Sequence, residues 1–228
     1  LPGQLEFDPT PSPVSFLFIS GGVLHEVERR LGNQVRGGIP LNFVPSAAPA
    51  ATGSTAIIPC LAAGVGRPTI ISVNLATGVE GWRLATRSSV MAAAVSGGSS
   101  SRPMIYFVEE NQGVYAYPAA SAHQAAPAHS WASLTHGRNL EAPVVHDDIV
   151  LIGSDRGDFW CLDRVTGLAH WSVMSGTGIL GRPAASGDQV YFSNARGFHA
   201  YAREDGKHLW TYREPGRFLV RRDEAVYV

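Results

Sequence analysis

The chain has 228 residues, of which 45% are hydrophobic and 16% charged, and its formal net charge is −1. This length is sufficient for one domain with a substantial core, and the composition is not that of a disordered segment. The near-neutral charge argues against a phosphate-binding surface, and hence against a nucleic-acid partner. No apolar run approaches the ~20 residues of a membrane-spanning helix, so we expect no transmembrane segment.

The N-terminal half opens with an unusual segment. Residues 1–13, LPGQLEFDPTPSP, are rich in proline and predict an extended N-terminal arm, which leaves 14–228 as the folded domain. The first apolar run, 15–19, leads through Ser-Gly-Gly into a second run, as expected for two strands joined by a hairpin turn. The small-residue segments 45–55 and 95–102 are predicted to be loops between units.

The second half shows the clearest pattern. Residues 149–153 lead through a Gly-bearing turn into 159–162, and residues 190–192 lead in the same way into 198–201. A fainter strand precedes each of these hairpins and another follows it, so each period contains four short strands, the content of one propeller blade. A degenerate copy lies upstream, and its Ala-rich stretch 118–130 is predicted to be a long loop.

One eleven-residue phrase recurs along the chain. It reads SVNLATGVEGW at 72–82, CLDRVTGLAHW at 161–171 and AYAREDGKHLW at 200–210. The recurring tryptophans lie at 82, 131, 171 and 210, with steps of 49, 40 and 39 residues. A fixed phrase with a period near 40 residues indicates a repeat architecture. Five units are visible, and 218–228 contains runs from which a sixth could begin.

The phrase resembles the PQQ-like β-propeller repeat of quinoprotein dehydrogenases and BamB-like outer-membrane assembly lipoproteins, over roughly residues 15–228. The resemblance implies an all-β propeller of four-stranded blades, in which the phrase is a tryptophan-docking motif packed against a neighbouring blade. Asp163, Thr166, Gly167 and Trp171 match it, whereas other copies have Asn74, or Ala202 with Asp205, instead. The implied docking residues are Trp82, Trp131, Trp171, Trp210, Gly78, Gly167 and Gly206.

The termini raise the question of ring closure. Unit one has no convincing strand before residue 15, whereas 218–220 and 225–228 read as strands with no unit of their own. Because propellers avoid exposed edges, we expect the C-terminal strands to pair beside the first unit and close a five-blade ring. The alternative is that the chain stops inside a sixth blade.

The residue types that carry chemistry do not form a recognisable site. Cys60 and Cys161 lie in different units and are expected to be buried free thiols, since a disulfide needs Cα atoms within ~7 Å. The stretch with His123, His129 and His136, followed by His146, fits no compact zinc signature. The remaining candidates are predicted to have structural roles. We expect strand positions for His170, His199 and His208, turn caps at Asp155, Asp163 and Asp188, and solvated strand ends at Arg217, Arg221 and Arg222.

Catalytic motifs are also lacking. The sequence contains no Gly-x-Ser-x-Gly elbow and no phosphate-binding loop, and Gly64-Val65-Gly66 is predicted to be a hairpin turn. We therefore predict no catalytic, cofactor-binding or metal-binding residues, and no bound cofactor. The chain begins with Leu, which fits removal of a secretory signal as well as a trimmed boundary.

These observations favour a non-enzymatic propeller that binds protein partners through its blade-connecting loops, as a scaffold or assembly platform. The resemblance implies a periplasmic or extracellular location, and membrane association through a partner stays open. Two alternatives remain: a fragment or degenerate relative of a PQQ-dependent dehydrogenase, and the sensor domain of a larger receptor.

Overall fold

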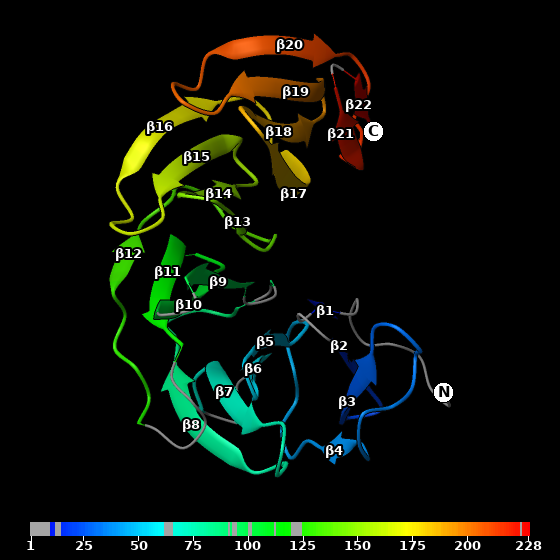
Figure 1. Cartoon of the computed structure of the whole chain (residues 1–228). Coiled ribbons are helices and arrows are strands. Elements are labelled where there is room, and N and C mark those ends of the chain that lie inside the picture. Colours follow the sequence, from blue (N-terminus) through cyan, green and yellow to red (C-terminus); the bar gives the residue numbers. More distant parts are fainter. Residues whose placement is uncertain are drawn as a thin grey trace.

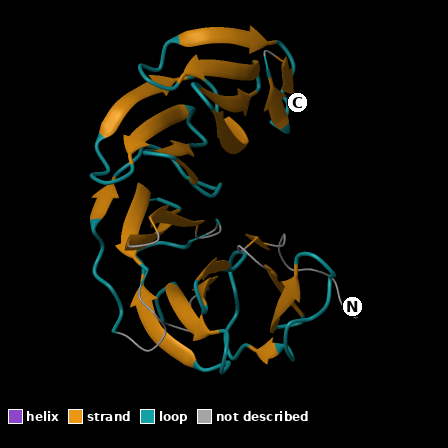
Figure 2. Ribbon diagram, viewed as in Figure 1, coloured by secondary structure: helices purple, strands orange, loops and turns teal. Residues whose placement is uncertain are grey.

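The structure is a computed structural model that describes residues 10–11, 15–61, 66–90, 92, 95–99, 102–111, 113–119, 125–223 and 225–228. Within these residues the regular elements are all β-strands, and there is no helix that could span a membrane. The described strands form five four-stranded antiparallel sheets and one two-stranded sheet, which follow one another around an open arc (Figures 1 and 2). The predicted all-β propeller with four-stranded blades is confirmed.

The sheets follow the chain order. The first sheet contains β1 (Thr10–Pro11), β2 (Ser15–Ser20), β3 (Val23–Glu28) and β4 (Ile39–Pro40). The second contains β5 (Ala50–Thr52), β6 (Thr55–Cys60), β7 (Thr69–Asn74) and β8 (Glu80–Ala85). The third contains β9 (Val95–Ser99), β10 (Arg102–Glu109), β11 (Gly113–Pro118) and β12 (Trp131–Ser133). The fourth contains β13 (Val144–His146), β14 (Ile149–Gly153), β15 (Asp158–Asp163) and β16 (Ala169–Met174). The fifth contains β17 (Ile179–Ser186), β18 (Gln189–Asn194), β19 (Gly197–Ala202) and β20 (His208–Tyr212), and the sixth contains β21 (Val220–Arg222) and β22 (Ala225–Tyr227).

Each four-stranded sheet pairs its strands in sequence order, with the first strand at the inner edge of the arc and the fourth at the outer edge (Figure 1). The first strands of neighbouring sheets contact one another, β1 with β5, β5 with β9, β9 with β13 and β13 with β17. The sheets are thus arranged radially like propeller blades.

Two segments predicted to be loops are instead inner strands or lead into them. Residues 45–55 include β5, and 95–102 include β9. The inner strands of neighbouring sheets lie close together near the axis, where small residues fit the taper. Because Ala, Gly and Ser are poor strand formers, their abundance hid these strands in the sequence.

The hairpin between the first and second strands recurs with one backbone geometry. Its left-handed position is occupied by Gly53 (φ 57°), Asp147 (φ 47°), Gly187 (φ 60°) and Asp223 (φ 51°). Two-residue hairpin turns need positive φ, and Gly, Asp and Asn tolerate it best. The β21–β22 hairpin therefore repeats the opening of the earlier sheets, as expected if a sixth unit begins there.

The predicted five-blade closure is wrong. In the described residues β21 and β22 pair with each other, and neither pairs with a strand of the first sheet. The inner position of the first sheet is taken by β1, which pairs with β2 through Thr10 and Pro11, so the C-terminal strands are not needed there. The rest of the predicted arm, residues 1–9 and 12–13, lies outside the described residues, and the division into arm and domain stays a prediction.

The hydrophobic core is divided into layers between successive sheets. Between the fourth and fifth sheets, Phe159 and Phe192 meet with ring centroids 4.6 Å apart, and Leu151 and Val190 are fully buried beside them. Cys161 lies in this layer, whereas Cys60 lies between the first and second sheets. Both are buried free thiols, as expected, and burial raises the pKa of each to about 12.

Candidate functional site

The recurring phrase forms a hydrogen-bonded turn between the third and fourth strands of a sheet. Asp163 Oδ1 accepts hydrogen bonds from the backbone N–H groups of Val165 and Thr166, at 3.0 and 2.7 Å. Asn74 Oδ1 accepts the corresponding two bonds in the second sheet, at 2.8 and 3.1 Å. An Asx cap of this kind explains the preference for Asp or Asn here. The fifth sheet has Ala202 at this position, which offers no side-chain acceptor.

Two of the recurring tryptophans connect one sheet to this turn in the next. Trp131 Nε1 donates a hydrogen bond to the backbone carbonyl of Arg164 at 3.0 Å. Trp171 Nε1 donates in the same way to the carbonyl of Arg203 at 2.8 Å. Each indole thereby satisfies a turn carbonyl of the following sheet.

The turn glycines make room for these rings. A Cβ atom added to Gly167 would lie 2.4 Å from the ring of Trp131, and one added to Gly206 would lie 2.5 Å from the ring of Trp171. Both glycines also have positive φ, 72° and 70°. Any other residue would therefore meet a clash as well as backbone strain.

The first sheet has no tryptophan, and two other residues occupy the equivalent place. Arg36 donates a guanidinium hydrogen bond to the backbone carbonyl of Leu75, and Glu26 pairs with the same guanidinium at 3.0 Å. Ile39 lies where the indole would be, 3.5 Å from a Cβ added to Gly78. Sequence reasoning missed Arg36 and Ile39, because neither residue type matches the recurring phrase.

The other two tryptophans also lie at sheet-to-sheet contacts. Trp82 is buried between the second and third sheets with Ile105 and Tyr115. Trp210 is half-buried against Tyr191 and the strands that follow it. The docking role of these two residues stays a prediction.

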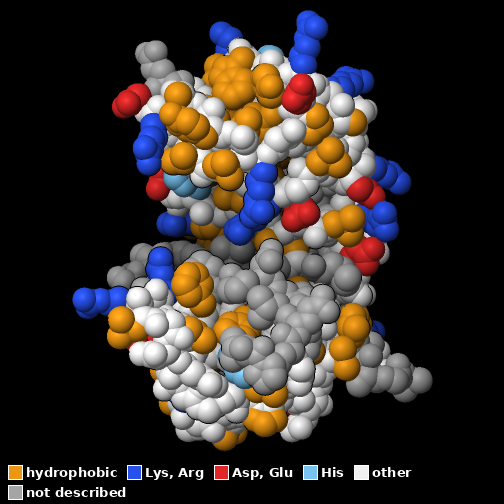
Figure 3. Space-filling view, turned by 90° about the vertical axis from the view of Figure 1, so that its right-hand side faces the viewer, with side chains coloured by type: hydrophobic (Ala, Val, Ile, Leu, Met, Phe, Trp, Pro, Cys, Tyr) orange, Lys and Arg blue, Asp and Glu red, His pale blue; other side chains and the backbone are white. Residues whose placement is uncertain are grey.

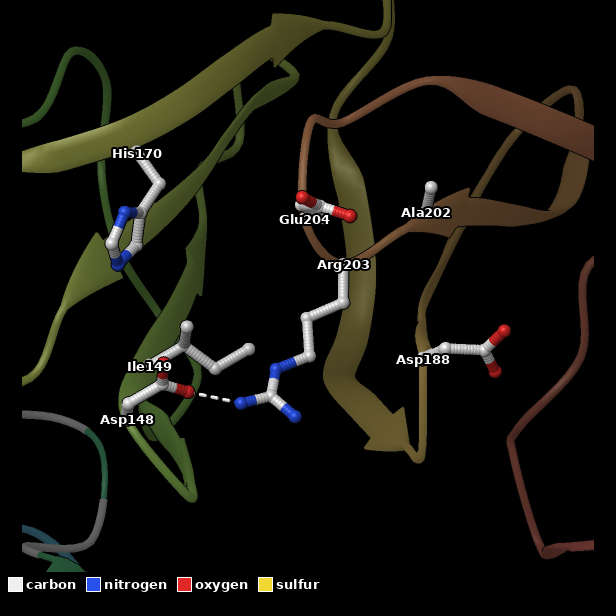
Figure 4. A pocket seen from close by; sticks show the side chains of 7 residues that line it. All are labelled: Asp148, Ile149, His170, Asp188, Ala202, Arg203 and Glu204. Atoms are coloured by element: carbon white, nitrogen blue, oxygen red, sulfur yellow. Dashed lines mark hydrogen bonds and ion pairs between the residues drawn. The ribbon is translucent and has the colours of Figure 1, made fainter.

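A cavity of about 500 Å³ lies between the fourth and fifth sheets, on the side where the recurring turns are (Figure 4). It is lined by Asp148, Ile149, His170, Asp188, Ala202, Arg203 and Glu204. Its walls come from the first hairpins of both sheets, from β16 and from the turn of the fifth sheet. The recurring inter-sheet contact through Trp171 therefore holds its two sides together.

Charge pairs line this cavity. The Arg203 guanidinium pairs with Asp147 at 3.1 Å and with Asp148, as the dashed line in Figure 4 marks. The hydrogen bond from Arg203 lowers the pKa of Asp148, and the hydrogen bond from Arg221, at 2.6 Å, lowers the pKa of Asp188. These carboxylates remain ionised at neutral pH, so the cavity presents mixed charge suited to hydrogen bonding and ion pairing.

The aspartates predicted to cap turns divide into two groups. Asp163 caps its own turn, as expected, and the hydrogen bond from the Thr166 hydroxyl lowers its pKa. Asp155 instead binds Arg138, at 2.8 Å to the backbone and 2.9 Å to the side chain, and Asp188 binds Arg221. Ion pairs from distant segments are invisible to local turn analysis.

The histidines of the 123–146 stretch are not gathered into one site. His129 lies against the rings of Tyr115 and Tyr117, and His136 against Trp160. His146 ends β13, and His123 lies outside the described residues, as do residues 64 and 65 of the predicted Gly64-Val65-Gly66 turn. Nowhere in the described residues do three or more His, Cys, Asp or Glu side chains form a group that could hold a metal ion.

His199 is the histidine with the most perturbed surroundings. Its ring contacts the Thr211 hydroxyl at 2.9 Å and Asn194 Oδ1 at 2.8 Å, and it stacks on Phe192. Burial lowers the pKa of His199, and nearby His208 and Arg196 lower it further. The imidazole is therefore held neutral and acts in packing and hydrogen bonding.

Comparisons with known proteins find PQQ-like repeats in the sequence and β-propellers among similar structures. Residues 121–227 match a PQQ-like family model described as outer membrane protein assembly factor BamB. No curated protein sequence matches the chain.

Among solved structures, BamB from Moraxella catarrhalis is 17% identical with a TM-score of 0.63, over 93% of this chain and 77% of that one. The quinohemoprotein alcohol dehydrogenase from Comamonas testosteroni is 13% identical with a TM-score of 0.66, over 92% of this chain and 43% of that one. The Cps50 (Swd1) β-propeller domain of Myceliophteria thermophila is 10% identical with a TM-score of 0.59, over 86% and 67%. Similarity at this level of identity shows a shared fold. The resemblance to PQQ-like β-propeller repeats is thus confirmed, by the family model over residues 121–227 and by the solved structures for the fold.

Proposed function

We propose that the protein is a non-enzymatic β-propeller that binds protein partners through its blade-connecting turns and serves as a scaffold or assembly platform outside the cytoplasm. The observation that carries the proposal is the turn beside the cavity. Val165 and Leu168 are 74% and 71% exposed there, and the charged wall of the cavity begins nearby at His170. Apolar side chains rimmed by polar groups are typical of protein-binding surfaces.

A binding platform also needs turns held in fixed positions. We propose that Trp131 and Trp171 act as docking residues, with Gly167 and Gly206 as their receptors. Their hydrogen bonds to turn carbonyls and their close ring contacts support this role. Preorganised turns lose less conformational entropy on binding, which favours recognition by a rigid face.

The family model supports an assembly role for the proposed platform. Its description names an outer membrane protein assembly factor, and it matches the half of the chain that holds the cavity. We therefore propose that the partners are extracytoplasmic proteins and that any membrane association is provided by a partner.

A site-specific photocrosslinking residue at Leu168 tests the proposal in cells. We expect a discrete crosslinked product with a protein partner, recovered from an extracytoplasmic fraction. The matched control is Leu134, which is 69% exposed and directly follows β12 of the third sheet. Equal crosslinking at both positions, or a protein found only in the cytoplasm, would count against the proposal.

A quinoprotein role is the second candidate, favoured by the similarity in fold to the quinohemoprotein alcohol dehydrogenase. The side chains described do not bring together the acidic ligands that a cofactor-associated cation would need, so no residues are assigned to such a group. Absorbance of the purified protein and its thermal shift with added PQQ and Ca²⁺ distinguish the candidates. A stoichiometric cofactor would favour the enzyme over the scaffold.

A further inference from the structure

We propose that the cavity between the fourth and fifth sheets binds a basic side chain, arginine or lysine, of the partner protein. This inference rests on the proposed function, because it names the chemistry of the partner that the neighbouring turn contacts. The charges around the cavity, the apolar residues beside it and the fixed backbone of its walls carry the inference.

The side of the cavity between the β13–β14 hairpin and the turn of the fifth sheet has an excess of negative charge. Asp148 and Glu204 line it, and Asp147 lies beside Asp148 in the same hairpin. Among the lining residues that the structure describes, Arg203 is the one guanidinium, and it pairs with Asp147 at 3.1 Å and with Asp148. Within the described part of the chain, no cationic side chain pairs with Glu204. One positive charge therefore faces three carboxylates.

A fourth carboxylate lies behind His170. The His170 ring lines the cavity, and its Nε2 lies 3.7 Å from Asp163 Oδ2. In Figure 4 His170 stands on the wall formed by the fourth sheet and Glu204 on the wall formed by the fifth. Asp188 lies on the other side of Arg203 and is already paired with Arg221. A cation placed between the two walls thus has carboxylates on both sides.

This excess of charge is local. The whole chain has a formal net charge of −1, and Figure 3 shows a face on which basic and acidic side chains are interspersed rather than gathered by sign. A recess lined mainly by one sign of charge attracts ligands of the opposite sign. An anionic ligand would be repelled by the carboxylates, and Arg203, the cation that it would need, is already bound to two of them.

The spacing of the carboxylates suits a long side chain rather than a metal ion. In the part of the chain that the structure describes, no three His, Cys, Asp or Glu side chains converge into a group that could hold a metal. Ca²⁺ needs about six to eight oxygen ligands around one point, whereas a guanidinium or ammonium group can pair with carboxylates that stand apart. The cavity volume of about 500 Å³ lies in the range of protein ligand sites, ~300–1,000 Å³, so a basic residue can enter with part of its own chain.

Apolar surface for the stem of such a side chain lies in and beside the cavity. Ile149 and Ala202 belong to the lining, and Val165 and Leu168 are 74% and 71% exposed on the adjoining turn. Lysine and arginine cover apolar surface with their methylene stems while the charged head pairs with carboxylates. The mixed lining therefore fits a basic side chain better than a small inorganic cation.

The backbone of both walls is already held by hydrogen bonds. The Arg203 N–H donates to the Asp188 carbonyl at 2.9 Å, and the Arg203 carbonyl accepts from Trp171 Nε1 at 2.8 Å. On the opposite wall, the Arg164 N–H donates to the Asp148 carbonyl at 2.8 Å. A preformed site loses less conformational entropy on binding, so the cavity can accept a side chain without rearrangement of its walls.

A fluorescein-labelled peptide, GRGLGRGLG, is the probe, and the same peptide with citrulline in place of both arginines is the matched control. Citrulline is close to arginine in size but carries no charge. Fluorescence anisotropy measures binding to the whole protein and to the variants Glu204→Gln, Arg203→Met and Glu214→Gln. Glu214 is an exposed residue that follows β20, outside the lining, so its variant controls for the change in net charge.

We expect saturable binding of the arginine peptide that weakens at least about threefold with Glu204→Gln. Arg203→Met should strengthen binding at least about threefold, because it frees Asp147 and Asp148 for the ligand. Glu214→Gln should leave binding unchanged, and circular dichroism confirms that the variants remain folded. The proposal is overturned by an absence of saturable binding, by equal binding of the citrulline peptide, by weaker binding with Arg203→Met, or by equal effects of Glu204→Gln and Glu214→Gln.

The peptide assay and the crosslinking experiment separate this inference from the proposed function. A crosslinked partner at Leu168 without binding of the arginine peptide would overturn the assignment of a basic ligand and leave the platform role standing. Charge-dependent peptide binding without a crosslinked partner would support the cavity as a site for a basic ligand and count against the platform role.

Discussion

Replacing Gly206 with Ala probes the contact between sheets most directly. Gly206 has a φ of +70°, and the new Cβ would lie 2.5 Å from the Trp171 ring. Gly32 also has a φ of +70°, with nothing within 4 Å of an added Cβ, so it isolates the backbone cost. A left-handed alanine costs about 1–2 kcal/mol, and overpacking adds about 1–3 kcal/mol. We therefore expect Gly206→Ala to lower the free energy of unfolding by about 2–5 kcal/mol, and Gly32→Ala by about 1–2 kcal/mol.

A double-mutant cycle with Trp171→Ala completes the test. Removing the indole leaves a cavity and an unpaired carbonyl, at a cost of about 3–5 kcal/mol, but it also removes the clash. In that background Gly206→Ala should cost only the backbone term of about 1–2 kcal/mol. Urea unfolding followed by circular dichroism, with m-values compared between variants, gives the energies. Equal costs for Gly206→Ala and Gly32→Ala, or strict additivity in the cycle, would refute the docking geometry.

Three further predictions concern titratable groups. Burial lowers the pKa of His199, so as the pH falls the unfolded chain binds a proton at this histidine before the folded protein does. The free energy of unfolding should therefore decrease as the pH drops below about 6.5. His199→Gln should reduce this pH dependence in a series of melting temperatures. Since burial raises the pKa of Cys60 and Cys161 to about 12, neither thiol should react with an aromatic disulfide reagent at pH 8 until the protein unfolds, and fast labelling of the native protein would contradict their placement. Arg203→Met should raise the pKa of Asp148, which NMR titration can follow. The ion pair stabilises the fold only at pH values above the ordinary carboxyl pKa, and its contribution there should be under ~1 kcal/mol and smaller at high salt.

Local features of the chain were readable from the sequence because they depend on nearest neighbours. The strands of the fourth and fifth sheets follow the apolar runs and their Gly, Asp and Asn turns, as at Asp163 and Gly187. The 40-residue spacing of Trp131 and Trp171 indicated which residues would occupy equivalent positions, since each unit repeats the same local contacts.

Features that depend on several sheets at once were decided only by the tertiary structure. Arg36 and Ile39 take the place of an indole because the first sheet must still satisfy the carbonyl of Leu75, and no repeat pattern records that substitution. The cavity beside Arg203 joins side chains more than 50 residues apart, through ion pairs that sequence spacing does not encode.

Ring closure is the clearest example of a feature that the sequence pattern does not determine. The runs at 218–220 and 225–228 were recognisable as strands, but whether they meet the first sheet depends on the angle added at every sheet-to-sheet contact. Hydrophobic alternation fixes which face of a strand is buried, not how far the arc has turned when the last strand is reached. The sequence therefore determined the repeating unit, and the packing of each unit on the next decided that β21 and β22 lie at the open end of the arc (Figure 1).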